Sequence, residues 1–496
     1  MSLITGKFFI FLCILFLAYY LLPNKKYQWV LLLCGSLFFY ANSSPYYLIF
    51  LLISSLTTYY LGILVSKSDD KSKSRKYILL GIIVNIGILF VLKYTVLVVD
   101  IFASLTGTIA PEINFILPLG ISFYTFMVVS YIVDVYKGEI SAESNFFKYL
   151  LYVCYFPQII EGPINRYSHM KDELYKEHIF DFIRCRDASY RILMGLFKKV
   201  VIAGRFGVYV DRVFDNVSGY NGLTLLLATI FYVVQLYADF SGCMDLVLGI
   251  SELFGIKMAE NFNLPLFSEN VSEFWRRWHI TLGAWFRDYI YYPVFRSDFS
   301  KKLKSVFAKT PLKKQAMNIC AAVALFCVWF FTGLWHGAAI HYVVWGLYYA
   351  VILIVGLFMG NDFKKWKKKL GITKDTKWYK VFSIVRTLII VTFGELIFRA
   401  NTMADVCYVI KKVATDFSLS FSSIANSLLP FTEDNTAMAY GGIAIVCEIC
   451  FFVVELYSYL GKDTFKKHKY VNAFILIVAT LLFGVFGESG FLYMAY

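Results

Sequence analysis

The chain has 496 residues, of which 59% are hydrophobic, 19% aromatic and only 17% charged, and its formal net charge is +14. This composition excludes an ordinary soluble domain, which carries more charge. It also gives no support to nucleic-acid binding, because the basic residues lie in short loops and not in a groove with stacking aromatic residues. Apolar runs of about 20 residues recur from end to end. They predict an all-α, multi-pass membrane protein with a single membrane domain over residues 1–496.

The predicted spans follow one another without a soluble insertion. They start near Phe8, Trp29, Tyr47, Tyr77, Phe115, Phe147, Ser189, Leu223, Asp239, Met317, Tyr342, Val381, Met438 and Tyr470. Two segments contain helix breakers, because residues 115–135 carry Pro118 and Gly120 and residues 147–160 carry Pro157. Non-helical backbone at membrane depth is tolerated only inside protein or beside water. The broken segments therefore indicate a cavity within the protein.

Loop charge predicts the orientation in the membrane. Lys and Arg gather in residues 67–76, 296–314, 364–380 and 462–469. The positive-inside rule places these segments in the cytoplasm. Residues 104–114 and 415–437 carry no Lys or Arg and are expected to face outward. Counting spans from the first basic loop puts both chain ends outside.

Residues 235–294 differ from their surroundings because they are dense in charge. Their charged or ionisable residues include Asp239, Asp245, Glu252, Glu260, Glu269, Glu273, Arg276, Arg277, His279, Arg287 and Asp288. Charge inside a membrane protein needs partners or water. We therefore expect Asp239 and Asp245 to be structural and to pair with Arg276, Arg277 or Arg287. Residues 272–279 predict an amphipathic helix on which Glu273 and Arg277, four residues apart, form a pair. A cytoplasmic re-entrant helix held by salt bridges is an equally good interpretation of this segment.

Two of the six histidines stand in apolar surroundings, where an ionisable side chain usually serves a function. They are His279, in FWRRWHIT, and His336, in TGLWHGA. Histidine is the side chain best suited to proton transfer near neutral pH. The alternative for each is a packing histidine that bonds a backbone carbonyl. The ten cysteines are scattered and no His/Cys cluster has zinc spacing, so we expect no metal site and no disulfide.

A series of ordered motifs extends this pattern. They include residues 32–40 (LLCGSLFFY), 117–139 (LPLGISFYTFMVVSYIVDVYKGE), 155–167 (YFPQIIEGPINRY), 195–203 (GLFKKVVIA), 238–242 (ADFSG), 261–265 (NFNLP), 274–288 (FWRRWHITLGAWFRD) and 332–338 (TGLWHGA). With these motifs the chain resembles the membrane-bound O-acyltransferase (MBOAT) family over nearly its full length. Within that family it is most similar to the branch that contains the membrane subunit of bacterial alginate O-acetylation.

The resemblance implies a ring of transmembrane and re-entrant helices around a central tunnel, with a motif core at about residues 115–345. His336 matches the acyl-transfer histidine of the family's LWHG motif. His279 matches the second histidine, in WRRWH, which lines the route to it. One departure follows Pro293, where members of this branch often carry a Gly-Gly-Asn turn and this chain continues into a basic loop. We expect that loop to meet a cytoplasmic donor or lipid headgroups.

The predicted reaction moves an acyl group, most simply acetyl, from a cytoplasmic thioester donor for O-acetylation of an extracytoplasmic polysaccharide or cell-wall polymer. The donor is expected to be acetyl-CoA or carrier-linked, with no tightly bound cofactor. A neutral imidazole at His336 takes the proton of the attacking hydroxyl, and Gly333 and Gly337 permit close backbone approach. His279 orients the substrate, completes a relay or stabilises the oxyanion. The predicted substrate path is Trp275, Arg276, Arg277, Trp278, Trp335, Asn165 and Asp239.

The two arginines at 276 and 277 are expected either to attract an anionic donor or to reach lipid headgroups. Two other functions stay open. A relative with the same scaffold transfers D-alanine to teichoic acid from a carrier protein, although the Arg-Arg pair favours the acetylation branch. A channel or transporter is the alternative outside enzymes, and the lack of a visible inverted repeat weighs against it.

The resemblance also implies a partner and a location. The expected partner is an extracytoplasmic acetyltransferase of the serine-hydrolase (SGNH) type, for which residues 415–437 are a candidate docking surface. The expected location is the bacterial cell (inner, cytoplasmic) membrane, with membrane lipids around the chain and no nucleic acid as a partner.

Overall fold

The computed structural model describes residues 3–43, 45–108, 117–373, 376–431, 437–462 and 468–486. These residues form helices joined by turns and short loops, and no strand occurs among them. The all-α class predicted from the sequence is therefore confirmed.

Contacts between helices divide the described chain into two compact units. The first contains the described parts of Met1–Gly195 and Cys243–Glu260, and the second those of Leu196–Gly242 and Asn261–Leu492. The long helix α11 (Gly222–Leu253) contributes its first part to the second unit and its last part to the first. That the chain acts as a single domain stays a prediction.

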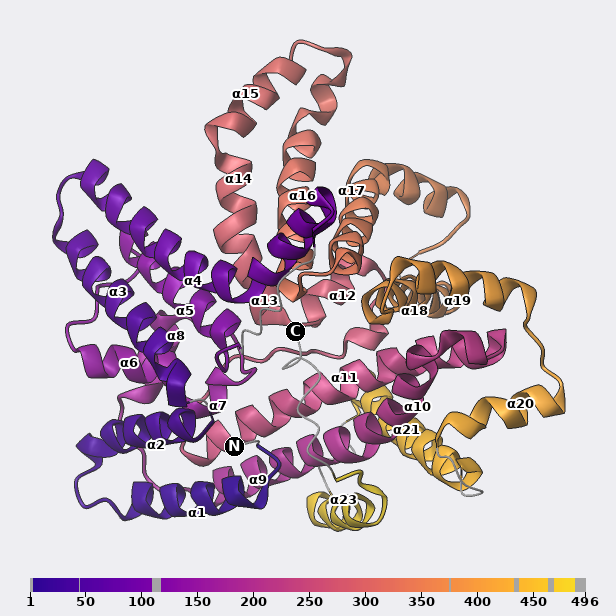
Figure 1. The fold of residues 1–496 in the computed structure, drawn as a ribbon, viewed down its shortest axis with the longest axis horizontal. Coiled ribbons are helices and arrows are strands. Elements are labelled where there is room, and N and C mark those ends of the chain that lie inside the picture. The colour runs from indigo at the N-terminus through magenta and orange to yellow at the C-terminus, as the bar shows by residue number, and fades with distance from the viewer. Residues whose placement is uncertain are drawn as a thin grey trace. The chain divides into compact units, whose positions relative to one another are not determined.

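The first unit carries the N-terminal helices, drawn from indigo to magenta in Figure 1. They are α1 (Gly6–Leu21), α2 (Gln28–Ser43), α3 (Leu48–Lys67), α4 (Lys71–Thr106), α5 (Ile121–Lys137), α6 (Phe146–Cys154), α7 (Phe156–Ile159), α8 (Tyr167–Leu174) and α9 (Phe182–Leu196). Helices α3, α4 and α5 pack against one another, with Leu61, Ile78 and Ile132 buried between them.

Both broken segments of the first unit lie where the sequence predicted them. Helix α5 begins only after Gly120, whose φ of 68° is in the left-handed region, and a Cβ there would lie 1.8 Å from the carbonyl oxygen of Ile159. Only glycine fits this position. The other break separates α6 from α7 at Tyr155, two residues before Pro157. Residues 115 and 116 of the first segment lie outside the described part of the chain.

The second unit contains the rest of the chain. Besides the first part of α11 and short 3-10 helices, it includes the π-helix η3 (Phe197–Ala203), α10 (Gly204–Asp215), α12 (Val271–Arg277), α13 (Ile280–Phe286), the π-helix η6 (Arg287–Tyr291), α14 (Tyr292–Arg296), α15 (Asp298–Phe307), α16 (Ala316–His336), α17 (Ile340–Lys369), α18 (Lys377–Arg399), α19 (Met403–Thr415), α20 (Phe421–Leu428), α21 (Ala437–Tyr459) and α23 (Lys469–Phe483). Helices α14 and α15 lie beside α16, which forms a hairpin with α17 (Figure 1).

Seven helices of the described residues are long and apolar enough to cross a membrane. They are Pro45–Lys67, Lys71–Val99, Gly222–Leu253, Pro311–His336, Ile340–Lys369, Lys377–Arg399 and Ala439–Tyr459. The multi-pass prediction is confirmed. Separate spans starting near Leu223 and Asp239 were predicted, and this is wrong, because α11 runs through both positions as one helix of 32 residues.

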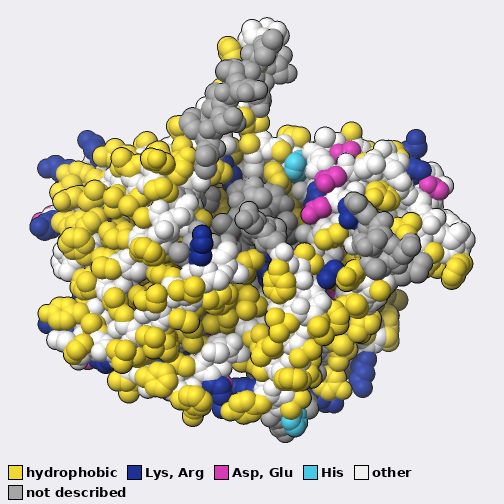
Figure 2. Space-filling view, turned by 60° about the horizontal axis from the view of Figure 1, so that its bottom comes forward, with side chains coloured by type: hydrophobic (Ala, Val, Ile, Leu, Met, Phe, Trp, Pro, Cys, Tyr) yellow, Lys and Arg dark blue, Asp and Glu magenta, His cyan; other side chains and the backbone are white. Residues whose placement is uncertain are grey.

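The surface is typical of a multi-pass membrane protein. Hydrophobic side chains cover most of the face shown in Figure 2, and Lys and Arg form small groups among them. Large apolar side chains such as Ile14 on α1, Ile389 on α18 and Leu481 on α23 are largely exposed. Exposed apolar area of this extent is unfavourable in water but suits a surface covered by lipid.

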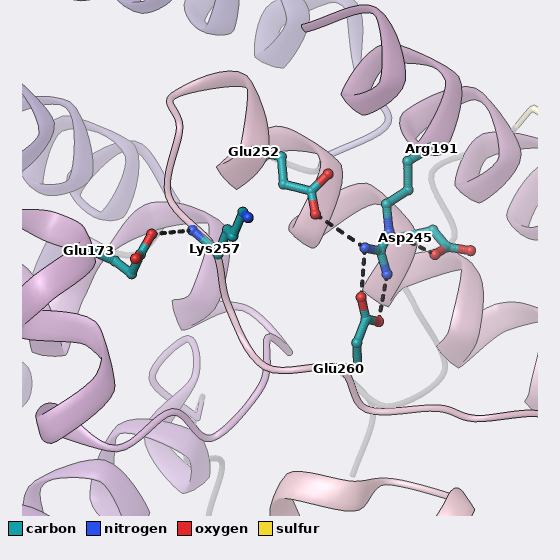
Figure 3. A network of polar contacts seen from close by, with 6 residues as sticks. All are labelled: Glu173, Arg191, Asp245, Glu252, Lys257 and Glu260. Atoms are coloured by element: carbon teal, nitrogen blue, oxygen red, sulfur yellow. Dashed lines mark hydrogen bonds and ion pairs between the residues drawn. The ribbon is translucent and has the colours of Figure 1, made fainter. Parts of the chain in front are cut away.

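The last part of α11 joins α9 through one arginine of the first unit (Figure 3). The Arg191 guanidinium lies 3.1 Å from Asp245, 3.3 Å from Glu252 and 2.7 Å from Glu260. Asp245 was predicted to pair with an arginine of residues 276–287, and this is wrong. Its partner comes from α9, because α9 and the end of α11 belong to the same compact unit.

Candidate functional site

His336 is the last residue of α16 and is 3% exposed. Its ring packs against Trp335, Trp345 and Phe398, with centroids 4.7, 4.9 and 5.0 Å away. The helix ends there because Gly337 takes up an extended backbone, with φ −180° and ψ 170°. The imidazole therefore lies at the turn between two membrane-spanning helices, inside a wall of aromatic rings.

Close backbone approach explains the glycines beside His336. A Cβ on Gly333 would lie 2.5 Å from the carbonyl oxygen of Tyr342, and one on Gly337 would lie 2.3 Å from the ring of the same residue. Both distances are far below ordinary van der Waals contact. The prediction that these glycines allow close approach is confirmed.

His279 stands between α12 and α13, in a left-handed conformation with φ 44° and ψ 54°. Its side chain is 3% exposed and meets the ring of Phe240 edge-on, at a centroid distance of 4.8 Å. Burial lowers the pKa of His279 from its ordinary value to about 3, so the imidazole is neutral near pH 7. The predicted helix over residues 272–279 is too long, because α12 ends at Arg277.

One indole ring contacts both histidines. Trp335 lies 4.7 Å from the His336 ring and 6.3 Å from the His279 ring, measured between centroids. All three residues belong to the second unit. The structure thus brings together the two histidines, which are 57 positions apart, and the tryptophan predicted to line their path.

Trp275 also belongs to the aromatic wall. Its ring packs on Trp329, Trp345 and Tyr349 at centroid distances of 4.9, 5.6 and 4.8 Å. Trp345 in turn touches His336. Trp275 is therefore one ring removed from His336.

Trp278 lies in a neighbouring cluster. It packs against Phe262 and Phe274 at 5.1 and 5.5 Å, and Phe262 packs on Phe240, which touches His279. At 5% exposure Trp278 is a packing residue behind His279. Its place on a substrate path stays a prediction.

The two arginines of α12 differ in their surroundings. Arg277 forms the predicted ion pair with Glu273, at 2.7 Å, which confirms the four-residue pairing. Arg276 is exposed and donates a hydrogen bond to the Ser272 hydroxyl at 3.0 Å. Of these two arginines, Arg277 thus pairs with a carboxylate of α12, whereas Arg276 bonds a hydroxyl there.

Asp239 forms a buried ion pair that the sequence did not predict. Its carboxylate lies 2.5 Å from the ammonium group of Lys199, and the side chains are 2% and 8% exposed. Lys199 comes from the π-helix η3. The expected pairing of Asp239 with Arg276, Arg277 or Arg287 is wrong, because Lys199 holds its carboxylate, while Arg277 pairs with Glu273 and Arg287 with Asp288.

Asn165 belongs to the first unit and is 2% exposed. Its amide nitrogen donates to the Gln158 side chain at 2.7 Å, and its amide oxygen accepts the backbone N–H of Ala259 at 3.0 Å. These bonds join the loop after α7 to the segment that follows α11. Asn165 thus has a structural role within this unit, and its place on a substrate path stays a prediction.

Two residues of the site were missed by sequence reasoning. Asn261, which is fully buried, lies with its side-chain oxygen 3.5 Å from Nδ1 of His279. Lys199 holds Asp239. Both stand inside motifs of the family, NFNLP and GLFKKVVIA, so the signal was present, but their partners are far away in the sequence. Within the described ranges, no group of three or more His, Cys, Asp or Glu side chains forms a metal site, and the absence of a metal stays a prediction.

Comparison with known proteins adds an independent line of evidence. The family model of the membrane-bound O-acyltransferases matches residues 102–309. The probable alginate O-acetylase of Pseudomonas syringae pv. tomato is 32% identical over 80% of this chain and 72% of its own length. The peptidoglycan O-acetyltransferase of Helicobacter pylori is 28% identical over 87% and 83%, respectively. The teichoic acid D-alanyltransferase of Bacillus subtilis is 33% identical over 59% of this chain and 71% of its own length.

These observations define a multi-pass membrane enzyme with two buried histidines around a shared indole. The chain belongs to the membrane-bound O-acyltransferase family. It is therefore an acyltransferase, and the channel or transporter interpretation loses its support. The ring of helices and the central tunnel implied by the family stay predictions for this chain.

Proposed function

We propose that this protein moves an acetyl group from a cytoplasmic thioester donor across the membrane for O-acetylation of an extracytoplasmic polysaccharide or cell-wall polymer. The observation that carries the proposal is His336, buried at the turn between two membrane-spanning helices and joined to His279 through Trp335. The relatives add support, because an alginate O-acetylase and a peptidoglycan O-acetyltransferase each align with at least 80% of the chain.

The proposed step is a direct acyl transfer. A hydroxyl oxygen attacks the thioester carbonyl, a C–O bond forms, and the C–S bond breaks to release the thiol. The neutral imidazole of His336 takes the hydroxyl proton during the attack and returns it to the leaving sulfur. The aromatic wall around His336 excludes water, which favours transfer over hydrolysis. His279 is assigned to the substrate path next to this site.

The donor is proposed to be acetyl-CoA or an acetylated carrier, held only for the reaction. Arg276 is the better of the two arginines for attracting such an anionic donor, because its neighbour Arg277 is already paired with Glu273. The proposed location is the bacterial inner membrane, in keeping with the bacterial sources of the relatives.

An extracytoplasmic acetyltransferase of the SGNH type is the proposed partner. Residues 415–437 stay the proposed docking surface, and the described part of that segment supports it. Helix α20 and the residues before it expose Leu419, Phe421 and Ile424, without a Lys or Arg among residues 415–431. A surface of this kind suits a protein partner that also lies at the outer membrane face.

The test uses matched histidine variants in a membrane preparation supplied with labelled acetyl donor. His336→Ala should abolish transfer of label to the polymer while the protein reaches the membrane in normal amounts. His341→Ala is the control, because His341 is also buried and stands five residues away, at the start of α17. Normal transfer by the His336 variant would reject the catalytic assignment.

D-Alanyl transfer to teichoic acid is the second proposal. It is favoured by the 33% identity to the enzyme of Bacillus subtilis, although that match covers only 59% of the chain. The test supplies the same membranes with a D-alanyl carrier instead of the acetyl donor. The mass added to the polymer, measured by mass spectrometry, then shows which of the two acyl groups is transferred.

A further inference from the structure

The backbone around His279 is strained in two places that face each other. Among the described residues, the only non-glycine residues with positive φ are Leu264, at 49°, and His279, at 44°. The segments that carry them are hydrogen-bonded together, because the Asn263 N–H donates to the Arg277 carbonyl and the Ile280 N–H to the Asn261 carbonyl, each at 3.0 Å. Such strain is unfavourable in itself and clusters at functional sites.

Asn261 is the centre of this arrangement. Its side-chain oxygen accepts the backbone N–H of Thr281 at 3.0 Å and the hydroxyl of Thr281 at 2.7 Å. A backbone N–H can only donate, so the atom that receives it must be the oxygen of the amide and not the nitrogen. The same oxygen lies 3.5 Å from Nδ1 of His279.

An oxygen at this position favours one tautomer of the His279 imidazole. A lone pair on Nδ1 would face the lone pairs of the Asn261 oxygen, whereas a hydrogen on Nδ1 would face an acceptor. We propose that Asn261 is a positioning residue that holds His279 as the Nδ1–H tautomer and leaves the lone pair of the ring on Nε2. The inference rests on the proposed function only where it concerns catalysis.

The tautomer narrows the role of His279. With its hydrogen on Nδ1, the neutral ring can accept a hydrogen bond at Nε2 but cannot donate one there. His279 therefore binds a substrate hydroxyl or amide N–H through Nε2. It does not stabilise an oxyanion through that nitrogen, since such stabilisation needs a donor. Of the three roles predicted for His279, this leaves orientation of the substrate and participation in a relay.

Two variants of similar bulk separate positioning from packing. Asn261→Leu and Thr281→Val both remove the 2.7 Å hydrogen bond between these side chains. Only the Asn261 variant also removes the acceptor beside Nδ1. Asn261→Leu also removes the acceptor of the Thr281 backbone N–H, so activity is compared per amount of folded protein. A purely structural role predicts that activity in both variants falls only in proportion to the amount of folded protein. The positioning role predicts a fall in kcat of roughly 10–100-fold for Asn261→Leu and little change for Thr281→Val.

The decisive measurement is the tautomer itself. Solid-state or solution NMR of protein labelled with ¹⁵N-histidine, with the His279 signal assigned by its loss in His279→Gln, should show the Nδ1–H form in wild type and Thr281→Val. Asn261→Leu should shift the population toward the Nε2–H form. An Nε2–H ring in wild type overturns the inference and leaves the proposed reaction untouched. An inactive but well-folded wild type with the Nδ1–H form would count against the proposed function alone.

A third variant keeps the test open if Asn261→Leu does not fold. Asn261→Asp retains the acceptor oxygen and adds a negative charge, which raises the pKa of the imidazole. The acid limb of its pH–activity profile should therefore move upward by about 1–3 units relative to wild type. An unchanged acid limb in a folded, active Asp variant would overturn the contact between residue 261 and His279.

Discussion

A complete ion pair lies inside the second unit, where Lys199 meets Asp239. Asp239 is followed by Phe240, whose ring touches His279. The pair therefore stands next to the aromatic layer that supports the second histidine. Its attraction offsets the large desolvation cost of each charge, but only while both partners are present.

Removing one partner is expected to be worse than removing both. Lys199→Met should lower the free energy of unfolding by about 3–5 kcal/mol, because it removes the ammonium group that pairs with the buried Asp239 carboxylate. The double variant Lys199→Met/Asp239→Leu should recover most of that loss. Thermal unfolding of the purified protein in detergent, followed by tryptophan fluorescence, measures both.

The exposed pair of Lys301 and Asp298 supplies the control, because its nitrogen and oxygen lie at a similar distance, 2.8 Å, with both side chains largely exposed. Lys301→Met should change stability by less than about 1 kcal/mol. Equal unfolding temperatures for Lys199→Met and Lys301→Met would contradict the proposed role of the buried pair.

Residue contacts were predictable from the sequence only where local geometry decides them. Glu273 and Arg277 are four apart on one helix, so their pairing follows from the helical repeat. Asp239 and Lys199 are forty positions apart, and no periodicity connects a residue of η3 with one of α11. The left-handed backbone of His279 was equally hidden, because it depends on hydrogen bonds to residues 261–263.

Helices α16 and α17 form the element that positions His336, and glycines set how closely they pack. A Cβ on Gly346 of α17 would lie 2.3 Å from the carbonyl oxygen of Trp329 on α16. That oxygen belongs to the backbone and cannot rotate away. The two helices would have to separate, which would disturb the ring contacts of Trp329 and Trp345 near His336.

Gly346→Ala should therefore lower stability by about 1–3 kcal/mol and reduce acyl transfer. Gly356→Ala, on the same helix, is the matched control, because a Cβ at that position would meet no atom within 4 Å. It should leave activity unchanged and favour the helix slightly, since alanine has the higher helix propensity. Unfolding midpoints and transfer rates of the two variants check this, and equal behaviour would rule out close packing as the reason for Gly346.

At the scale of elements, helix type was predictable and helix continuity was not. Pro157 and Gly120 marked true breaks, because each restricts or frees the backbone locally. A new span was predicted to start near Asp239, within the run that also holds Asp245. The structure keeps one helix there because Lys199 and Arg191 hold these carboxylates. Whether charge breaks a helix depends on partners that one sequence does not reveal.

At the scale of the whole molecule, composition alone was enough to predict a multi-pass membrane protein. The helices of the second unit now make the predicted orientation across the membrane more specific. Helices α16 and α17 are joined by residues 337–339, so Lys313 and the lysines of residues 364–369 lie at one end of the hairpin and His336 at the other. Phe398, near the end of α18, touches His336. Helix α19, which follows, therefore begins at the end of the hairpin where His336 lies.

This arrangement predicts opposite accessibility for two native positions. The lysine-rich end of α17 and the linker after it should be cleaved by trypsin in inside-out membrane vesicles and protected in right-side-out ones, because the basic end faces the cytoplasm. Cys407, exposed on α19, should react with a membrane-impermeant maleimide in right-side-out vesicles only. Mass spectrometry of the peptides reads both in one sample. Cleavage by trypsin and labelling of Cys407 in the same type of vesicle would contradict the predicted orientation of the hairpin. If both results were reversed, His336 would lie at the cytoplasmic face, where an extracytoplasmic polymer could not reach it directly.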